Sequence, residues 1–288
     1  MACNLKTAES LEPLRALLRD ARASGKSIGL VPTMGALHEG HLSLVRRARR
    51  ECGFTVASIF VNPLQFGPSE DLARYPRRPE EDAALLADEG VDLLYRPDAS
   101  AMYPSDFSTA VEVRGVSDGG EGSVRPGHFL GVATVVAKLF LQVAPDVAYF
   151  GRKDLQQVAV IRRMTRDLDF PLRLVVGETV REPDGLAHSS RNAYLSPEER
   201  KHAALFPKAL FAARDRADAG ETDARRLGNE TRTELERAGF TVDYAEVVDP
   251  ETMRPLDRVA PGAALAAAIR LGKTRLIDNV SLDGPRER

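Results

Sequence analysis

The chain has 288 residues, enough for two unequal domains, because domains usually hold about 100–200 residues. Its 43% hydrophobic and 28% charged residues are typical of folded globular proteins and exclude disordered, collagen-like and coiled-coil chains. Forty basic and 42 acidic side chains leave a net charge of -2, which argues against a broad basic surface for nucleic acid or anionic lipid. We therefore expect small-molecule substrates, with any anion bound locally.

The cysteines and the first residues indicate a cytoplasmic protein. Cys3 and Cys52 form neither a C-x-x-C pair nor a metal-spaced set, which suits a reducing compartment and gives no support for a zinc site. The sequence up to Thr7 lacks the basic stretch and apolar run of a secretory signal. No segment reaches about 18 uninterrupted apolar residues, so we expect no membrane segment.

The first half of the chain alternates between helical and extended patterns. Ser10 can cap a helix in which Leu14, Leu18 and Ala21 recur at helical spacing and which ends near Gly25. Strands are expected at 27–31, 54–61, 91–95, 147–150 and 172–176, and helices at 40–51, 79–89, 132–143 and 155–168. This order predicts a mainly parallel sheet with helices on both faces.

The pattern changes past Gly177. Pro183, Asp184 and Gly185 are typical of a turn. Helices are then expected at 197–219 and 223–238, followed by strands at 241–248, 264–270 and 274–277. We therefore expect an α/β domain at 1–179 and a smaller α+β domain at 180–288.

Two histidines lie where the first buried strand leads into a helix. Residues 31–41 read VPTMGALHEGH and leave the strand at the carboxyl edge of the sheet, where open α/β sheets bind ligands. A helix N-terminus favours phosphate, and Gly35 and Gly40 let a ligand approach the backbone. His38 and His41 are three residues apart, so both rings lean to one side of a helical turn. The pattern predicts a phosphate site; loop or cap histidines and metal ligands are the alternatives.

Two more motifs follow other strands. In FVNPLQFG at 60–67, Asn62 and Gln65 can donate and accept, which suits a substrate with hydroxyl and carboxylate groups, although an Asn-Pro turn fits equally. In FGRKDLQQ at 150–157, Lys153 suits charge developing on a phosphate and Asp154 suits ribose hydroxyls. A surface charge cluster that caps a helix is the alternative for this second motif.

The last two motifs lie outside this pattern. RPGHF at 125–129 precedes an apolar helix that contains Lys138. AHSSRN at 187–192 lies just past the expected domain boundary, and its two hydroxyls and guanidinium can form a mobile anion clamp. The same string is also typical of solvated loops.

Together the five motifs resemble the pantothenate synthetase family, the pantoate–beta-alanine ligases, in order from about Leu30 to Leu195. The resemblance implies a Rossmann-like nucleotidyl-transferase domain, a smaller C-terminal lid domain and a homodimer. It also implies ATP with Mg²⁺, D-pantoate and beta-alanine as ligands. The pantoate carboxylate would attack the α-phosphate of ATP, and the amine of beta-alanine would then displace AMP from the pantoyl adenylate. Positioning and charge stabilisation carry most chemistry of this kind.

The resemblance implies a role for each matching residue. His38 and His41 would hold the ATP phosphates, with His41 as proton donor, and Lys153 and Arg191 would also be catalytic. ATP would contact Met34, Gly35, His38, His41, Gly151, Lys153, Asp154, Val180, Ser189, Ser190 and Arg191. Pantoate would contact Met34, Asn62, Gln65 and Gln157, and Gln65 would also meet beta-alanine. No side chain is assigned to Mg²⁺, which would arrive with ATP. Glu121, Arg125 and His128 match family positions that are partly structural.

Three positions depart from the family pattern. Arg152 stands where an acidic residue is usual, His188 replaces a large apolar residue, and Leu141 takes a position that usually bears an amide. Two other functions fit part of the sequence. A nucleotidyl transferase that stops at a nucleotide conjugate leaves Gln65 and Gln157 unexplained. A sensing or structural module leaves unexplained why all the reactive side chains are kept.

Overall fold

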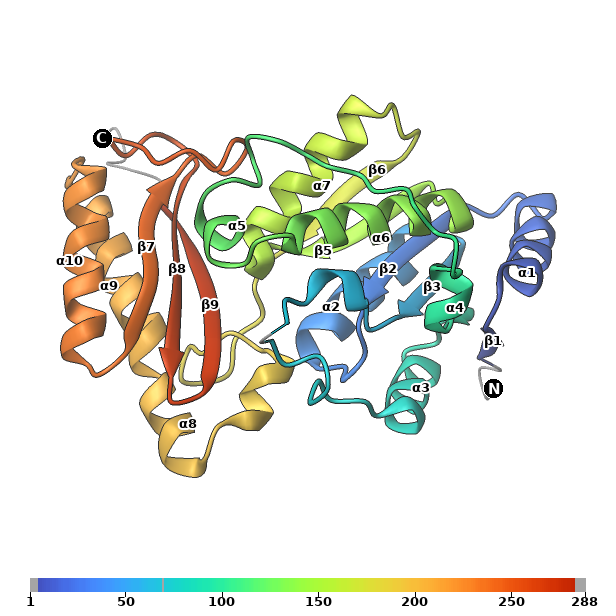
Figure 1. Ribbon diagram of the computed structural model, residues 1–288, viewed down its shortest axis with the longest axis horizontal. Coiled ribbons are helices and arrows are strands. Elements are labelled where there is room, and N and C mark those ends of the chain that lie inside the picture. Colours follow the sequence, from blue (N-terminus) through green and yellow to red (C-terminus); the bar gives the residue numbers. More distant parts are fainter. Residues whose placement is uncertain (1–4, 69, 283–288) are drawn as a thin grey trace. The chain divides into compact units, whose positions relative to one another are not determined.

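The structure is a computed structural model that describes residues 5–68 and 70–282, and the chain folds into two compact units (Figure 1). The first comprises the residues up to Val113 together with Arg125–Arg152 and Val160–Glu178. The second comprises Arg114–Val124, Lys153–Ala159 and the chain from Thr179 on. Cys3 lies outside the described residues.

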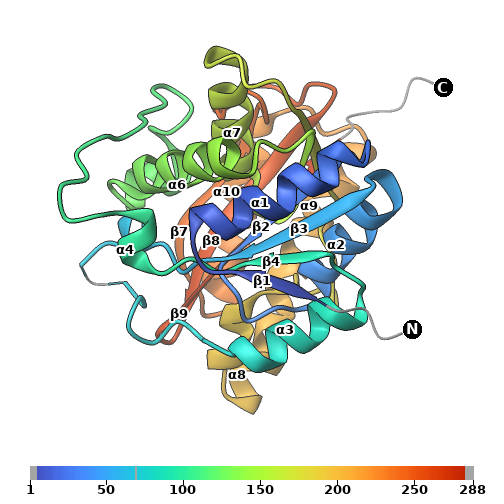
Figure 2. The ribbon, with the colours of Figure 1, turned by 90° about the vertical axis from the view of Figure 1, so that its right-hand side faces the viewer.

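The first unit contains a six-stranded sheet in which every pair of neighbouring strands is parallel, which confirms the predicted sheet (Figure 2). The strand order is β1-β4-β3-β2-β5-β6. The strands are β1 (Lys6–Ala8), β2 (Ile28–Thr33), β3 (Phe54–Ile59), β4 (Leu93–Tyr95), β5 (Val147–Gly151) and β6 (Arg173–Gly177). The short strand β1 had no counterpart among the sequence predictions.

Helices cover both faces of this sheet. The helices are α1 (Leu11–Ala23), α2 (Glu39–Glu51), α3 (Pro79–Asp88), α4 (Ala99–Met102) and α6 (His128–Val143). Figure 2 shows α1 and α6 on one face and α2 and α3 on the other. Beneath α2 and α3, Val45 and Leu86 join Val31 and Leu94 of the sheet in one buried cluster. Burial of these apolar side chains fixes the helices on the sheet.

The strand order decides where the predicted motifs lie. The chain goes from β2 to β3 on one side, and from β5 to β6 on the other, so the connections diverge between β2 and β5. Open α/β sheets bind ligands at such a switch point, outside the carboxyl ends of the strands. Because the strands are parallel, the segments that follow β2, β3 and β5 leave from the same edge, as the sequence predicts.

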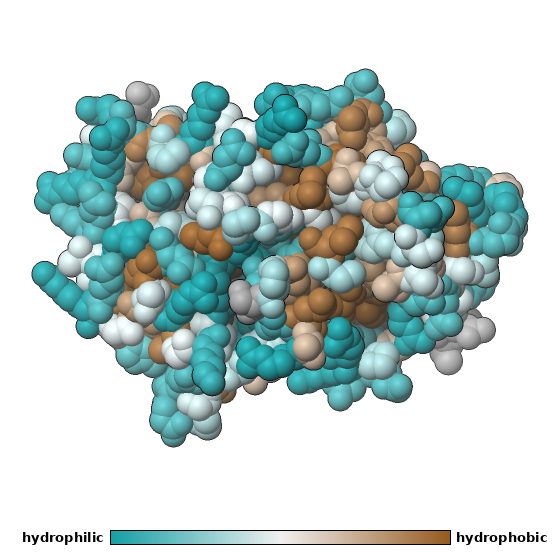
Figure 3. Space-filling model, in the orientation of Figure 1, coloured by the Kyte–Doolittle hydropathy of each residue, from teal (hydrophilic) through white to brown (hydrophobic). Residues whose placement is uncertain are grey.

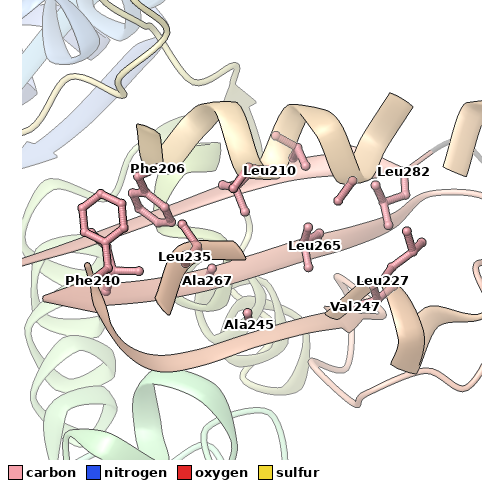
Figure 4. Close-up of a cluster of buried hydrophobic side chains, with 14 of the residues drawn as sticks. Phe206, Leu210, Leu227, Leu235, Phe240, Ala245, Val247, Leu265, Ala267 and Leu282 are labelled. Carbon is pink, nitrogen blue, oxygen red and sulfur yellow. The ribbon is translucent and has the colours of Figure 1, made fainter. Parts of the chain in front are cut away.

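The second unit contains a three-stranded antiparallel sheet with helices packed on it. Its strands are β7 (Thr241–Val248), β8 (Ala263–Leu271) and β9 (Thr274–Leu282), and its helices are α5 (Gly120–Val124), α8 (Pro197–Ala203), α9 (Leu205–Asp218) and α10 (Ala224–Arg237). Helix α7 (Leu155–Asp167) begins in this unit and ends in the first. In Figure 4, Phe206 and Leu210 of α9 and Leu235 of α10 pack over Leu265 of β8.

Two elements of this unit differ from the sequence prediction. The single helix expected at 197–219 is divided at Ala204 into α8 and α9. Pro207 has no backbone N–H to give to the carbonyl of Ala203, and its ring would clash with that carbonyl in a continuous helix. Strand β9 runs on to Leu282 rather than ending at Ile277, because the polar pair Asp278 and Asn279 continues the ladder with β8.

The surface near α10 is hydrophilic. Figure 3 shows hydrophilic residues along that side of the second unit. On α10 itself, Arg226 pairs with Glu230 one helical turn away at 2.8 Å. Such exposed pairs add little stability.

Within residues 5–68 and 70–282, no helix has both the length and the apolar character needed to cross a membrane.

Candidate active site

The loop between β2 and α2 has a backbone that only certain residues adopt. Gly35 has φ +82° and Ala36 has φ +48°. A Cβ on Gly35 would lie 2.9 Å from Oδ2 of Asp82 and 3.1 Å from Ile59. Glycine at 35 therefore supplies both a left-handed conformation and the space for Asp82 to approach.

Asp82 of α3 holds this loop. Its Oδ2 accepts the backbone N–H of Ala36 at 2.9 Å, and its Oδ1 accepts that of Leu37 at 2.8 Å. The side chain is buried, and burial raises the pKa of Asp82 above its ordinary value although the two N–H groups work against that shift. No local sequence pattern points to Asp82, which lies 46 residues from Ala36. Its spacing of four from the buried Leu86 places both on the inner side of α3.

His38 and His41 come together at the start of α2. His38 is the N-cap residue, and the two ring centroids are 4.0 Å apart with an interplanar angle of 37°. The backbone N–H of His38 donates to Nδ1 of His41 at 3.4 Å. A ring nitrogen that accepts this bond carries no proton, so a neutral His41 holds its proton on Nε2. The predicted pairing of the rings is thus present, and Nε2 of His41 is the nitrogen that can donate.

Asn62 and Gln65 lie in the turn after β3. Asn62 caps the short 3₁₀ helix Pro63–Gln65, and Gln65 is its last residue. The Nδ2 group of Asn62 donates to Oε1 of Gln65 at 3.1 Å and to the carbonyl of Gly131 at 3.0 Å. Its Oδ1 accepts the hydroxyl of Tyr103 at 2.8 Å. Nε2 of Gln65 contacts the sulfur of Met34 at 3.1 Å. Asn62 therefore orients Gln65, and Gln65 and Met34, both predicted to contact pantoate, lie side by side.

Gly131 of α6 permits this arrangement. A Cβ at position 131 would lie 2.2 Å from the carbonyl oxygen of Leu64, a distance that no side chain tolerates. The helix thus comes close enough for the Gly131 carbonyl to accept from Asn62. The role of Gly131 cannot be predicted from the sequence, since a glycine within a helix has several explanations.

Arg125 and His128 support the backbone of Gln65. Nδ1 of His128 lies 2.9 Å from the Gln65 carbonyl oxygen, and Nη2 of Arg125 lies 3.4 Å from it. Arg125 also forms a two-pronged ion pair with Glu70, at 2.6 and 2.8 Å. Burial acts to raise the pKa of Glu70, but the hydrogen bond and charge of Arg125 outweigh it, so this pKa lies below its ordinary value. These contacts give the RPGHF motif a supporting role.

In the second unit, Lys153 begins the segment that leads into α7. Its Nζ lies 3.8 Å from Oδ1 of Asp154, and its backbone carbonyl accepts a hydrogen bond from Nδ2 of Asn279 at 2.9 Å.

The two glutamines that follow, Gln156 and Gln157, differ in role. Gln156 is buried and bonds the segment ahead of α5 through the carbonyls of Val116 and Gly119, each at 2.9 Å. Gln157, the predicted pantoate contact, is half-buried and its side chain forms no hydrogen bond within the described part of the chain.

Residues 180–188 form a narrow hairpin. His188 donates its backbone N–H to the carbonyl of Val180 at 3.0 Å, and Arg181 forms a β-bridge with Ala187. Ser189 then caps the 3₁₀ helix Ser190–Tyr194, its Oγ accepting the N–H of Arg191 at 3.3 Å. The predicted adenine contact and the predicted serine and arginine clamp thus belong to one folded segment.

The departures from the family pattern have different surroundings. Leu141 is 67% exposed on α6. His188 takes part in the hairpin through its backbone, and Arg152 is half-buried in the 3₁₀ helix Arg152–Asp154. Glu121, a family position, is buried in the second unit, where Arg275 forms a two-pronged pair with it at 2.6 and 2.8 Å.

The described residues contain no group of three His, Cys, Asp or Glu side chains that could hold a metal ion. A Mg²⁺ ion usually keeps several waters and binds through substrate phosphates with one or two carboxylates.

Comparison with known proteins identifies the family. The model of the family described as pantoate-beta-alanine ligase matches residues 6–281. The chain belongs to the pantoate-beta-alanine ligase family. It is 50% identical to the pantothenate synthetase of Koribacter versatilis, over 98% of this chain and 99% of that protein. It is 55% identical to that of Acidiphilium cryptum, over 92% and 97% of the two chains.

Solved structures of this ligase family have the same fold. The pantothenate synthetase of Thermus thermophilus matches with a TM-score of 0.92 and 51% identity, over 96% of this chain and 99% of that one. The pantoate-beta-alanine ligase of Francisella tularensis matches with a TM-score of 0.82 and 31% identity, over 98% of this chain and all of that one. That structure is described as complexed with beta-gamma ATP and beta-alanine.

Proposed function

We propose that this chain is a pantoate–beta-alanine ligase that converts D-pantoate, beta-alanine and ATP into pantothenate, AMP and pyrophosphate. The proposal rests on family membership over nearly the whole chain. The single structural observation that carries it is the pair of rings of His38 and His41, 4.0 Å apart at the N-terminus of α2 and at the switch point of the sheet. Free backbone N–H groups and positive dipole ends at such a terminus favour a phosphate chain.

In the first step, a carboxylate oxygen of pantoate attacks the α-phosphorus of ATP. The bond from that phosphorus to the bridging oxygen of the β-phosphate breaks, and pyrophosphate leaves. His38 and His41 bind the phosphates, and Nε2–H of His41 donates to the departing oxygen. Hydrogen-bond donors that are already in place stabilise developing charge without reorganising. Asp82 keeps these donors in place by holding the loop that carries both rings.

In the second step, the neutral amine of beta-alanine attacks the acyl carbon of pantoyl adenylate. A C–N bond forms, the C–O bond to AMP breaks so that AMP leaves with the electron pair, and the nitrogen loses a proton to solvent. Adenylation makes this possible because AMP is a far better leaving group than the oxygen of a free carboxylate. Gln65 contacts both pantoate and beta-alanine in this proposal, which its amide allows because it can donate and accept.

The remaining roles follow the resemblance. Lys153 and Arg191 neutralise phosphate charge, and Ser189 and Ser190 add hydroxyl donors. Met34, Gly35, Gly151, Asp154 and Val180 contact ATP. Gln157 donates to pantoate, and its amide is not committed to another described residue. Asn62 contributes to the pantoate site by orienting Gln65 rather than through a spare N–H, because both of its N–H groups are already donated.

Four further features belong to the same proposal. ATP binds as its magnesium complex. Residues 1–179 bind ATP and pantoate, and residues 180–288 act as a lid. The chain works as a homodimer, which light scattering on the purified protein would test. It acts in the cytoplasm, the compartment that supplies ATP.

The test is a substrate-omission assay. ATP with pantoate alone should release one equivalent of pyrophosphate per chain and then stop, because the adenylate stays bound. Adding beta-alanine should start steady release of AMP. Continuous pyrophosphate release with a stable nucleotide conjugate as product would indicate a nucleotidyl transferase. Binding of ATP without any pyrophosphate or AMP would indicate a sensing module.

A further inference from the structure

Two polar residues in the middle of β9 have no place in the chemistry above. Asp278 and Asn279 are each 3% exposed, and they pair with Ala267 and Ala266 of β8. Buried polar side chains in a strand are costly unless their hydrogen bonds are made. The hydrogen-bond partners of Asp278 and Asn279 therefore indicate the role of these two residues.

Asn279 is bonded to the start of the predicted phosphate-binding segment. Its Nδ2 donates to the backbone carbonyl of Lys153 at 2.9 Å, although the two residues are 126 positions apart. The bond holds the main chain of Lys153 and does not occupy its ammonium, which lies 3.8 Å from Oδ1 of Asp154. Asn279 therefore sets where the Lys153 side chain begins.

Asp278 is bonded to the hairpin that precedes Ser189. Arg181 approaches it with both terminal nitrogens, at 2.6 and 3.0 Å. The same guanidinium donates to the carbonyl of Gly185 at 3.0 Å and to that of Asn279 at 3.1 Å. Burial raises the pKa of Asp278, and the paired guanidinium works against this shift. A planar guanidinium can serve these acceptors together, whereas an ammonium cannot.

We propose that Asp278, Asn279 and Arg181 form a positioning anchor that fixes the Lys153 segment and the hairpin leading to Ser189–Arg191 relative to each other. All of these residues lie in the second unit. This inference rests on the proposed function, in which both segments hold the phosphates of ATP. The anchor makes the two segments one preorganised group of donors, so neither has to be ordered separately when ATP binds.

The kinetic test is a double-mutant cycle. Asn279→Ala removes the bond to the Lys153 carbonyl, and we expect kcat/KM for ATP to fall about tenfold, the usual effect of one buried hydrogen bond. KM for pantoate should not change. In a Lys153→Ala background the same substitution should cost less than about twofold, because its effect passes through Lys153. Asn229→Ala, an exposed asparagine on α10, is the matched control and should have no effect.

Arg181→Lys tests the contacts between Asp278 and the hairpin. It keeps a positive charge beside Asp278 but cannot reach all the acceptors, and kcat/KM for ATP should again fall about tenfold. This loss should be smaller when Arg191 is already alanine, because only the part that acts through Lys153 then remains. Equal losses in the wild-type and alanine backgrounds, or no loss in either, would overturn the anchor. A normal rate in Lys153→Ala would overturn it as well, together with the role assigned to Lys153.

Amide hydrogen exchange tests the anchor without any activity. In Arg181→Lys, exchange should quicken both in peptides covering 180–191 and in peptides covering 152–157, while peptides of α10 stay unchanged. Faster exchange confined to 180–191 would show that the two segments are independent and would overturn the anchor. A wild-type protein that releases neither pyrophosphate nor AMP would instead contradict the proposed function.

Discussion

Asp82 provides a sharp test of how the histidine loop is held. In Asp82→Asn, one amide oxygen can still accept one backbone N–H, but the amide nitrogen faces the other. The variant therefore loses one charge-assisted hydrogen bond and leaves one buried N–H of Ala36 or Leu37 unsatisfied, each effect costing about 1–3 kcal/mol. Relief from burying a carboxylate, whose pKa burial raises, offsets part of this cost. We expect a net loss of about 2 kcal/mol in the free energy of unfolding.

Asp82→Asn should also lower the catalytic rate, because the loop that Asp82 holds carries His38 and His41. If the whole of this roughly 2 kcal/mol weakened the positioning of the rings, the rate would fall about 30-fold, so we expect kcat/KM for ATP to fall about 10- to 30-fold. Steady-state AMP release measures the rate, and urea unfolding measures stability. Asp88→Asn makes the same chemical change at an exposed position of the same helix and should alter neither.

Wild-type turnover in Asp82→Asn would refute this role of Asp82. So would an equal loss of turnover from Asp82→Asn in a His41→Ala background. That result would show a general loss of structure rather than an effect that passes through the histidines.

Three other variants test separate parts of the site. His41→Ala should lower kcat by about two to four orders of magnitude in AMP release, as expected for loss of an acid and electrostatic group. Gly131→Ala should raise KM for pantoate and lower the melting temperature, because its Cβ would lie 2.2 Å from the Leu64 carbonyl oxygen. Glu70→Gln should cost about 2 kcal/mol of stability at pH 7, since Glu70 is paired with Arg125. The pKa of Glu70 is lowered in the folded state, so this difference should be present above pH 4.5 and vanish as pH falls through the folded pKa.

Each of these variants has a clear contradictory outcome. A near-wild-type rate in His41→Ala would remove that residue from the chemistry. Gly119→Ala has open space around the new Cβ and serves as the control, so equal effects at 119 and 131 would refute the packing argument. A stability difference for Glu70→Gln that persists unchanged from about pH 7 to about pH 3 would show that charge pairing is not its source.

Local patterns in the sequence predicted most of the fold. The alternation of apolar runs located five of the six strands of the parallel sheet. Periodicity alone did not show that α8 and α9 are separate helices. Pro207 was the local signal for a break, because proline fits the first turn of a helix but not its interior. The strand predicted at 274–277 stops short of Asp278 and Asn279, whose residue types are rare in strands.

Site residues that directly follow strands could be predicted from the sequence. The residues that hold them in place from distant positions in the chain could not. The positions of His38, Gln65 and Gly151 follow from the geometry of a parallel sheet. Asp82 and Asn279 act across 46 and 126 residues, and no local pattern reveals such partners. Neighbouring glutamines are equally ambiguous in sequence, and only burial separates the structural Gln156 from the half-buried Gln157.

The most direct test of the central claim is the fate of a carboxylate oxygen of pantoate. Pantoate labelled with ¹⁸O in both carboxylate oxygens is incubated with the enzyme, ATP and beta-alanine, and the products are analysed by mass spectrometry. If pantoyl adenylate forms, one labelled oxygen should appear in AMP and one should remain in pantothenate. Label in inorganic phosphate or pyrophosphate, or AMP without label, would contradict adenylation of pantoate.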